Sequence, residues 1–231
     1  CRGRKSRSIS RILKRFRKIA KIGPLGAVVG FLMRPCYKKR MLALIGNHQT
    51  LEELALTGDI EVNYVDFINS YKTKELFEKL NPDVGVSISN SFISKNIFSI
   101  PRFGMVNIHH ELLPEFKGAA STFWQIYKFN SVTGYTIHTV TDKIDGGDIL
   151  FKKKIPIHFK SSLCKTISYN YAQSYMQSIY GMSDILSDFY KYYYNRQAQI
   201  DNSVSYTTPT FSEYVKAKIN HYRLSRITRG T

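Results

Sequence analysis

Acidic residues are absent from the first forty positions of the chain, although these positions contain fourteen lysines and arginines. The whole sequence has 231 residues, with 34 basic and 17 acidic side chains and a formal net charge of +17. Taking those fourteen away leaves 20 basic residues against all 17 acidic ones, a balance of only +3. The positive charge is therefore concentrated in the N-terminal stretch, and the rest of the chain is nearly neutral. The net charge alone does not indicate that the protein binds a polyanion.

Cysteine is scarce, and long apolar runs are missing. Cys1, Cys36 and Cys164 are odd in number and far apart, which argues against a disulfide framework and a zinc knuckle. We therefore expect a reducing compartment, the cytoplasm, and no metal. The longest apolar run, 25–33, is about half as long as the roughly 18 residues that a membrane span needs, so we expect no transmembrane segment. Hydrophobic residues make up 43% of the chain, which argues against a wholly disordered protein.

Strand and helix patterns alternate from residue 41 onward, after a basic helix predicted over 8–20. This alternation predicts an α/β fold with a mostly parallel sheet. The expected helices cover 50–57, 71–80, 119–129 and 161–194, and the expected strands cover 61–65, 84–88, 105–108, 134–140 and 149–157. The chain is thereby divided into a basic helical segment over 1–40, a core over 41–160, and a long helix with a polar C-terminal tail over 161–231.

Asn107 and His109 stand two residues apart at the end of an apolar strand, so strand alternation places both side chains on one face. Asp145 follows in a glycine-rich turn after the next strand. An Asn that donates to an oxyanion, a His that moves a proton and an Asp that orients the His suit acyl transfer. No Ser or Cys nucleophile accompanies them, which favours direct transfer to an amine. From the residues alone, His109 could equally be a core histidine, and Asp145 a turn residue.

The run from 107 to 120, Asn-Ile-His-His-Glu-Leu-Leu-Pro-Glu-Phe-Lys-Gly-Ala-Ala, resembles the signature of the folate-dependent formyltransferases. Two further elements follow in the family's order and spacing, at 133–138 and 145–150. The resemblance covers about residues 60–155, and 206–210 resembles a tail segment of the sugar-modifying members. It implies a Rossmann-like formyltransferase fold, and formyl transfer from 10-formyltetrahydrofolate to a primary amine through a tetrahedral intermediate.

The resemblance also implies roles for single residues. Asn107 and His109 would hold the formyl oxygen and assist proton transfer, and Asp145 would pair with His109. The folate would be enclosed by Asn90, Phe92, Ile93, Leu113, Thr139, Val140, Asp142 and Ile144. The amine substrate would be contacted by His110, Glu111, Lys117, Gly118 and Trp124. Plainer interpretations make His110 and Glu111 exposed loop residues, Trp124 a helix packing residue and His138 a packing residue on its strand.

The amine could be a nucleotide-linked amino sugar, glycinamide ribonucleotide or methionyl-tRNA. In the family, the tRNA enzymes carry an additional C-terminal barrel, whereas only about 80 residues follow Leu150 here. The glycinamide ribonucleotide enzymes begin directly with a glycine-rich phosphate loop and lack a basic helical insertion. The resemblance therefore favours an amino sugar carried on a nucleotide diphosphate. A non-enzymatic basic module that binds RNA or a membrane, on a relic formyltransferase fold, is the alternative from a different class.

The start of the chain departs from the family's pattern. A complete member opens with a strand and a glycine-containing turn, and residues 2–40 resemble a basic insertion that follows two strands and a helix in longer relatives. We therefore expect the family's N-terminal strands to be missing from this chain. The aromatic-rich helix over 161–194 makes a homodimer plausible, and we expect no specific nucleic-acid partner.

Overall fold

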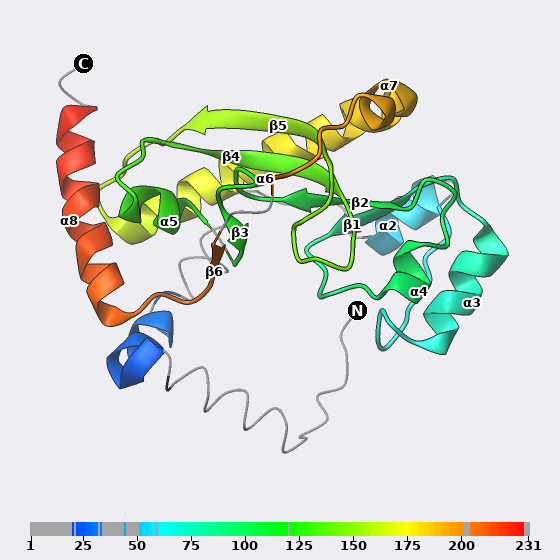
Figure 1. Ribbon diagram of the computed structural model, residues 1–231, viewed down its shortest axis with the longest axis horizontal. Coiled ribbons are helices and arrows are strands. Elements are labelled where there is room, and N and C mark those ends of the chain that lie inside the picture. The colour runs from blue at the N-terminus through cyan, green and yellow to red at the C-terminus, as the bar shows by residue number, and fades with distance from the viewer. Residues whose placement is uncertain are drawn as a thin grey trace.

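The computed structural model describes residues 20, 22–31, 33, 44, 51–58, 60–119, 121–200 and 204–228. Within these residues, helices surround a four-stranded sheet (Figure 1). The sheet has the spatial order β1-β2-β4-β5, and its strands are β1 (Gly85–Ile88), β2 (Met105–His109), β4 (Val132–Thr139) and β5 (Ile149–Pro156). The predicted α/β class is confirmed.

The four strands do not all run in one direction. β1 and β2 are parallel and are connected through α4 (Lys95–Phe98), whereas β2–β4 and β4–β5 are antiparallel. The described sheet is thus less parallel than the sequence predicts, because β4 and β5 are joined by a short turn over 140–148, and such a turn reverses the chain. The register places Asn107 opposite His138 and His109 opposite Thr136.

Helix α6 (Leu163–Ser187) runs along the sheet and packs on β4 (Figure 1). Val106 and Ile108 of β2 are buried in one apolar cluster with Met182 and Ile185 of α6. Strand alternation turns the intervening polar side chains of β2 to the opposite face of the sheet. The sheet therefore has an apolar face under α6 and a second face that carries the polar residues of β2.

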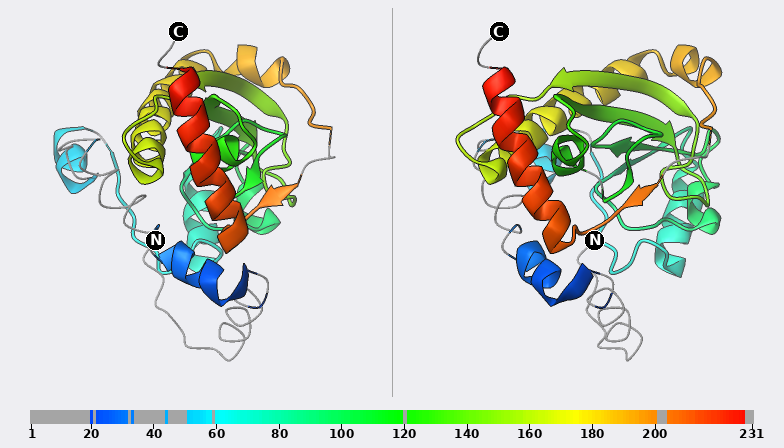
Figure 2. Two further views of the ribbon diagram at one scale, coloured as in Figure 1. Left: turned by 90° about the vertical axis from the view of Figure 1, so that its left-hand side faces the viewer. Right: turned by 60° about the vertical axis from the view of Figure 1, so that its left-hand side comes forward.

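A second core joins segments that are far apart in the sequence. Figure 2 shows α8 (Phe211–Ile227) crossing α5 (Thr122–Tyr127), with the helical residues 22–31 near the start of α8. The two-residue strands β3 (Lys117–Gly118) and β6 (Ser205–Tyr206) pair in parallel beside this core. Its buried members are Val29, Met33, Phe116, Phe123, Trp124, Ile126, Ile157, Leu163, Ile167, Ala217 and Leu224.

The helices predicted over 50–57 and 71–80 are confirmed as α2 (Leu51–Thr57) and α3 (Tyr71–Leu80). The side chain of Ser70 accepts a hydrogen bond from the N–H of Thr73 and begins α3, and Asn81 ends it in a left-handed conformation. Both signals can be recognised in the sequence, which explains why the bounds of α3 are predicted closely.

The strand predicted over 61–65 is wrong, because these residues are irregular. Residues 161–194 are mostly helical as predicted, but the helix is interrupted at Asp188, between α6 and α7 (Phe189–Tyr194). The polar tail contains the 17-residue helix α8, which the sequence analysis does not predict.

Polar residues on the buried side of α8 explain why its pattern is hidden. The side-chain amide of Asn220 donates to the carbonyl oxygens of Ile126 and Tyr127, at 3.1 and 2.9 Å. His221 Nε2 lies 2.7 Å from the hydroxyl of Thr166. These hydrogen bonds allow a polar face to be buried, so the apolar period that identifies an amphipathic helix is interrupted.

Cys164 is disulfide-bonded, a feature that the sequence argument against a disulfide framework does not predict. The cytoplasmic location, the homodimer and the three-part division of the chain stay predictions. The basic helix expected over 8–20 lies outside the described residues, apart from residue 20. Among the helices that the structure describes, none is both long and apolar enough to cross a membrane. The same residues include no group of three or more His, Cys, Asp or Glu side chains that could hold a metal ion.

Candidate active site

His109 lies at the end of β2 and is almost fully buried. Its Nε2 lies 2.6 Å from the carbonyl oxygen of Phe116. Because a carbonyl oxygen can only accept, this hydrogen bond places the proton of the neutral ring on Nε2 and leaves a lone pair on Nδ1. Nδ1 faces Oδ1 of Asp145 at 3.7 Å. His109 is therefore arranged to take up a proton on the nitrogen nearest to a carboxylate.

Asp145 lies in the turn between β4 and β5. Its φ of 49° is left-handed, a conformation that Asp adopts more readily than most residues. Oδ2 of Asp145 accepts a hydrogen bond of 2.7 Å from the N–H of Gly118. The turn also needs Gly147, because a Cβ at this position would lie 1.8 Å from the carbonyl oxygen of Thr139. The close approach of this turn to β4 brings the carboxylate of Asp145 beside His109.

His138 enters the site from β4, opposite Asn107. Its Nδ1 lies 2.8 Å from the carbonyl oxygen of Thr139, so Nδ1 carries the proton and Nε2 accepts from the amide Nδ2 of Asn107 at 3.2 Å. Nε2 also lies 3.8 Å from Oδ1 of Asp145. Burial, followed by the charge of His109, lowers the pKa of His138 to about 4, so this ring is neutral at pH 7. The contact orients the amide of Asn107 and leaves its second N–H for another acceptor.

The sequence interpretation treated His138 as a packing residue, and the structure brings it into the site. His138 lies opposite Asn107 because β2 and β4 pair in an antiparallel register, and this register could not be predicted from the sequence. A strand pairing of this kind joins positions 31 residues apart and is not encoded in either strand alone.

A pocket of about 190 Å³ opens beside these side chains. Asn107, His138 and Asp145 form part of its wall. Five of the eight residues predicted to enclose the folate also line it: Asn90, Phe92, Ile93, Val140 and Ile144. The other three, Leu113, Thr139 and Asp142, lie outside this lining, and Leu113 is fully buried. Eight of the twelve lining residues are polar or charged, and four are apolar, so the pocket offers both hydrogen-bond partners and apolar contacts to a small polar molecule.

Glu111 and His110 are not exposed loop residues, so that prediction is wrong. Glu111 has no exposed surface, which also contradicts a direct contact with substrate. The ring of His110 lies between those of Tyr171 and Tyr175, with centroid distances of 5.2 Å to each. Neither ring nitrogen of His110 has a hydrogen-bond partner among the described residues. Burial, followed by the charge of His109, lowers the pKa of His110 to about 4.

The other residues predicted to contact the amine lie on or near β3. Trp124 is buried, its indole N–H donates to the carbonyl oxygen of Thr207 at 3.2 Å, and its ring packs 4.8 Å from that of Tyr206. These contacts support the packing interpretation of Trp124. Lys117 is also buried, and Gly118 contacts Asp145 through its N–H. A substrate contact of Lys117 or Gly118 stays a prediction.

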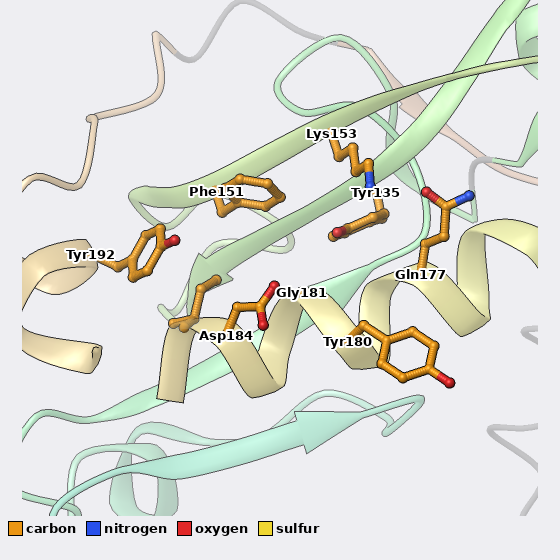
Figure 3. Close-up of a pocket in the computed structure, with 9 residues that line it drawn as sticks. Tyr135, Phe151, Lys153, Gln177, Tyr180, Gly181, Asp184 and Tyr192 are labelled. Carbon is orange, nitrogen blue, oxygen red and sulfur yellow. The ribbon is translucent and has the colours of Figure 1, made fainter. Parts of the chain in front are cut away.

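A second pocket, of about 210 Å³, lies between β4, β5 and α6 (Figure 3). Tyr135 and Phe151 from the strands, Asp184 from α6 and Tyr192 from α7 are arranged around it. None of the residues predicted for the site lines this pocket. It is therefore separate from the candidate active site.

A family model described as formyl transferase matches residues 68–172. This range includes Asn107, His109, His138 and Asp145, together with every residue of the pocket beside them. The match covers 105 of the 231 residues, and over this range the chain is similar to the formyl transferase family.

Curated relatives match this chain over part of their own length. The bifunctional polymyxin resistance protein ArnA of Wigglesworthia glossinidia brevipalpis is 34% identical over 124 residues, which are 52% of this chain and 19% of that protein. The methionyl-tRNA formyltransferase of Ehrlichia canis is 37% identical over 105 residues, 45% of this chain and 35% of the relative. The methionyl-tRNA formyltransferase of Clostridium botulinum is 31% identical over 147 residues, 62% and 46% of the two chains. The chain thus spans less than half the length of these relatives.

Among solved structures, a sugar N-formyltransferase from Shewanella sp FDAARGOS_354 aligns with a TM-score of 0.48 and 19% identity, over 67% of this chain and 65% of that chain. A 4-N formyltransferase from Francisella tularensis aligns with a TM-score of 0.49 and 18% identity, over 65% of each chain. Both similarities are distant.

Proposed function

We propose that this protein transfers a formyl group from 10-formyltetrahydrofolate to a primary amine. The observation that carries the proposal is that Asn107 and Asp145 line one pocket and His109 faces Asp145 at 3.7 Å, within the segment that matches the formyl transferase family model. Asn107 is oriented by His138, His109 by the carbonyl oxygen of Phe116, and Asp145 by the N–H of Gly118. The three side chains therefore hold these orientations without a bound substrate.

The three side chains suit the steps of acyl transfer. The amine nitrogen attacks the formyl carbon, and the second N–H of Asn107 donates to the oxygen that becomes negative. Nδ1 of His109 accepts the proton that the amine loses, and the carboxylate of Asp145 stabilises the resulting imidazolium from 3.7 Å. His109 then returns the proton to the folate nitrogen as the bond from that nitrogen to the formyl carbon breaks. The products are the formamide and tetrahydrofolate.

We place the folate in the pocket of about 190 Å³. Ile93, Val140 and Ile144 would contact the faces of the pterin ring, while Asn90 offers an amide at the edge. Leu113 is fully buried and would support this lining from behind, while folate contacts of Thr139 and of the exposed Asp142 stay predictions.

For the amine, we infer a nucleotide-linked amino sugar. Residues 206–210 resemble a tail segment of the sugar-modifying members, and Tyr206 of this segment pairs with Gly118, whose N–H donates to Asp145. This placement beside the candidate site supports an amino sugar. Methionyl-tRNA is the second candidate, because the relatives from Ehrlichia canis and Clostridium botulinum are methionyl-tRNA formyltransferases.

The test is mass spectrometry of candidate amines after incubation with the protein and 10-formyltetrahydrofolate. The panel contains nucleotide amino sugars, glycinamide ribonucleotide and methionyl-tRNA, and His109→Ala serves as the control protein. We expect the mass gain of one formyl group on an amino sugar only. A gain on methionyl-tRNA or glycinamide ribonucleotide alone would overturn the proposed substrate, and no gain on any amine would overturn the proposed reaction.

Isothermal titration with a tetrahydrofolate analogue separates binding from chemistry. We expect binding to the wild-type protein and to Asp145→Asn, since this variant keeps the lining of the pocket. RNA binding that falls steeply with salt, without folate binding, would instead support the non-enzymatic basic module.

A further inference from the structure

Glu111 follows the histidine pair of the signature and carries a carboxyl group with no exposed surface. Oε2 accepts a hydrogen bond from the side-chain amide of Gln125 on α5, and Oε1 accepts one from the hydroxyl of Thr133 on β4. Both distances are 2.7 Å. The carboxyl group therefore connects the segment after β2 to a helix and to a neighbouring strand.

The surroundings of this carboxyl group make its ionised form costly. Burial raises the pKa of Glu111 to about 7, although hydrogen bonds from Gln125, Thr133 and the N–H of Leu112 act in the opposite direction. All three of these partners are neutral, and no charged side chain in the described part of the chain contributes to the shift. A buried carboxyl group without a charged partner reduces stability, so its presence needs a reason other than stability.

The backbone of the same segment is held on β4. The hydroxyl of Thr136 donates to the carbonyl oxygen of Glu111 at 2.8 Å and accepts from the N–H of Leu113 at 3.0 Å. The N–H of Phe116 donates to the carbonyl oxygen of Leu112 at 3.0 Å, which closes a turn. The residues that follow Glu111 are thus fixed by a short series of hydrogen bonds.

The far end of this segment holds two residues of the candidate active site. The carbonyl oxygen of Phe116 accepts from Nε2 of His109 at 2.6 Å. The N–H of Gly118 donates to Oδ2 of Asp145 at 2.7 Å. A displacement of the segment would therefore change the His109 tautomer and the direction of the Asp145 carboxylate together.

We propose that Glu111 is a positioning residue for formyl transfer: its buried carboxyl group fixes residues 111–118, so that Phe116 and Gly118 hold His109 and Asp145 in their reactive arrangement. Glu111 acts through these residues and does not touch the substrate. The kinetic part of this inference rests on the proposed function, whereas the geometric part does not.

The experiment compares Glu111→Ala with Glu111→Gln and with two controls. Glu115→Gln changes a carboxyl group of the same segment whose side chain is 59% exposed. Asn170→Ala removes an equally buried polar side chain that donates to the carbonyl oxygens of His158 and Thr166, away from the segment. The readouts are kcat, the melting temperature, and the ¹⁵N NMR shifts of the His109 ring, which report which nitrogen carries the proton.

We expect the wild-type protein, Glu115→Gln and Asn170→Ala to show His109 protonated on Nε2. Glu111→Ala should show a mixture of tautomers and a kcat that is lower by about 10- to 100-fold, as expected for misplaced catalytic groups. Asn170→Ala should lower the melting temperature without this loss of kcat. Glu111→Gln should restore kcat to within about threefold, because its amide can accept from Gln125 and donate to the hydroxyl of Thr133.

Thr133→Val tests the proposal if Glu111→Ala does not fold, since it removes one of the two anchors and should shift kcat and the His109 tautomer in the same direction, by less. The proposal is overturned if a folded Glu111→Ala or Thr133→Val keeps the wild-type tautomer and kcat, or if Asn170→Ala loses kcat equally. Should the wild-type protein transfer no formyl group, the proposed function fails, while the NMR comparison still decides whether Glu111 positions His109.

Discussion

His109 and Asp145 face one another across 3.7 Å, and each is oriented by a backbone group of the same segment. Phe116 provides the acceptor for His109, and Gly118 provides the donor for Asp145. A proton on Nδ1 of His109 would convert their contact into a charged pair, which is the condition expected during amine attack. The geometry of the pair therefore suits His109 with a proton on both ring nitrogens, the form that exists after it has accepted the amine proton.

Asp145→Asn tests the charge of this pair at nearly constant shape. The amide oxygen can still accept from Gly118, so we expect a melting temperature close to that of the wild-type protein. Loss of the carboxylate should lower kcat by about 100-fold or more, comparable to the loss of one oxyanion donor. Steady-state kinetics and thermal unfolding of the two proteins check this. Near-normal turnover in Asp145→Asn would remove Asp145 from the proposed role.

Glu111 should make the stability of the protein depend on pH. Its pKa is about 7 in the folded protein and 4.5 ordinarily, so between these values the folded state binds more protons than the unfolded state. The free energy of unfolding therefore falls as pH rises from about 4.5 to 7 and no longer changes for this reason above 7. Relative to the wild-type protein, Glu111→Gln should gain about 2.5 kcal/mol between pH 5 and pH 8. Urea unfolding at several pH values measures this, and a constant difference would contradict it.

At the scale of elements, the strand pair β3–β6 brings the C-terminal part of the chain against the segment after β2. Gly118 of β3 has a φ of 79°, and a Cβ there would lie 2.4 Å from the hydroxyl oxygen of Ser205 and 2.7 Å from the carbonyl oxygen of Tyr206. The close contact of two backbones requires glycine at this position. The same N–H that lies in this contact also holds Asp145.

Gly118→Ala should therefore lower both the free energy of unfolding and the activity. We expect a loss of about 1–3 kcal/mol from the left-handed conformation alone, with an added loss from the contact with β6. Gly104→Ala is the matched control, because Gly104 has a φ of 70° but its Cβ would come no closer than 3.6 Å to a neighbour. Urea unfolding and kcat are measured for both. Equal effects of the two substitutions would show that the β3–β6 contact contributes nothing.

At the scale of the whole molecule, the C-terminal part of the chain reaches both the site and the second core. Gln199 donates to the carbonyl oxygens of Asp145 and Gly147, which supports the turn from behind. The amide of Asn220 instead joins α8 to the end of α5. Both contacts are made by residues from the C-terminal part of the chain. We expect the Gln199 contact to affect activity and the Asn220 contact to affect stability.

Gln199→Ala should lower kcat with a small effect on stability, because Gln199 contacts the turn that carries Asp145. Asn220→Ala should leave two buried carbonyl oxygens without this donor and lower the free energy of unfolding by about 1–3 kcal/mol, with kcat unchanged. Parallel measurements of kcat and thermal unfolding check the pair. A loss of kcat in Asn220→Ala, or its absence in Gln199→Ala, would contradict this separation.

The sequence determined the features that depend on local order. Alternation along one strand placed Asn107 and His109 on one face, and the glycine-rich turn placed Asp145 after the next strand. The family signature needs only residue order and spacing, and five of the eight residues that the resemblance assigns to folate binding line the pocket. Capping residues and strand periods act within a few positions of the chain, which is why α3, β2 and the α/β class could be predicted.

Only the tertiary structure decided which side chains meet. His138 contacts Asn107 because β2 and β4 pair antiparallel, and Glu111 is buried because α5 and β4 supply its two donors. The helix α8 is stable with Asn220 and His221 on its buried side because distant segments satisfy their hydrogen bonds. Burial and partner choice depend on contacts between segments far apart in the chain, and a local pattern does not contain them.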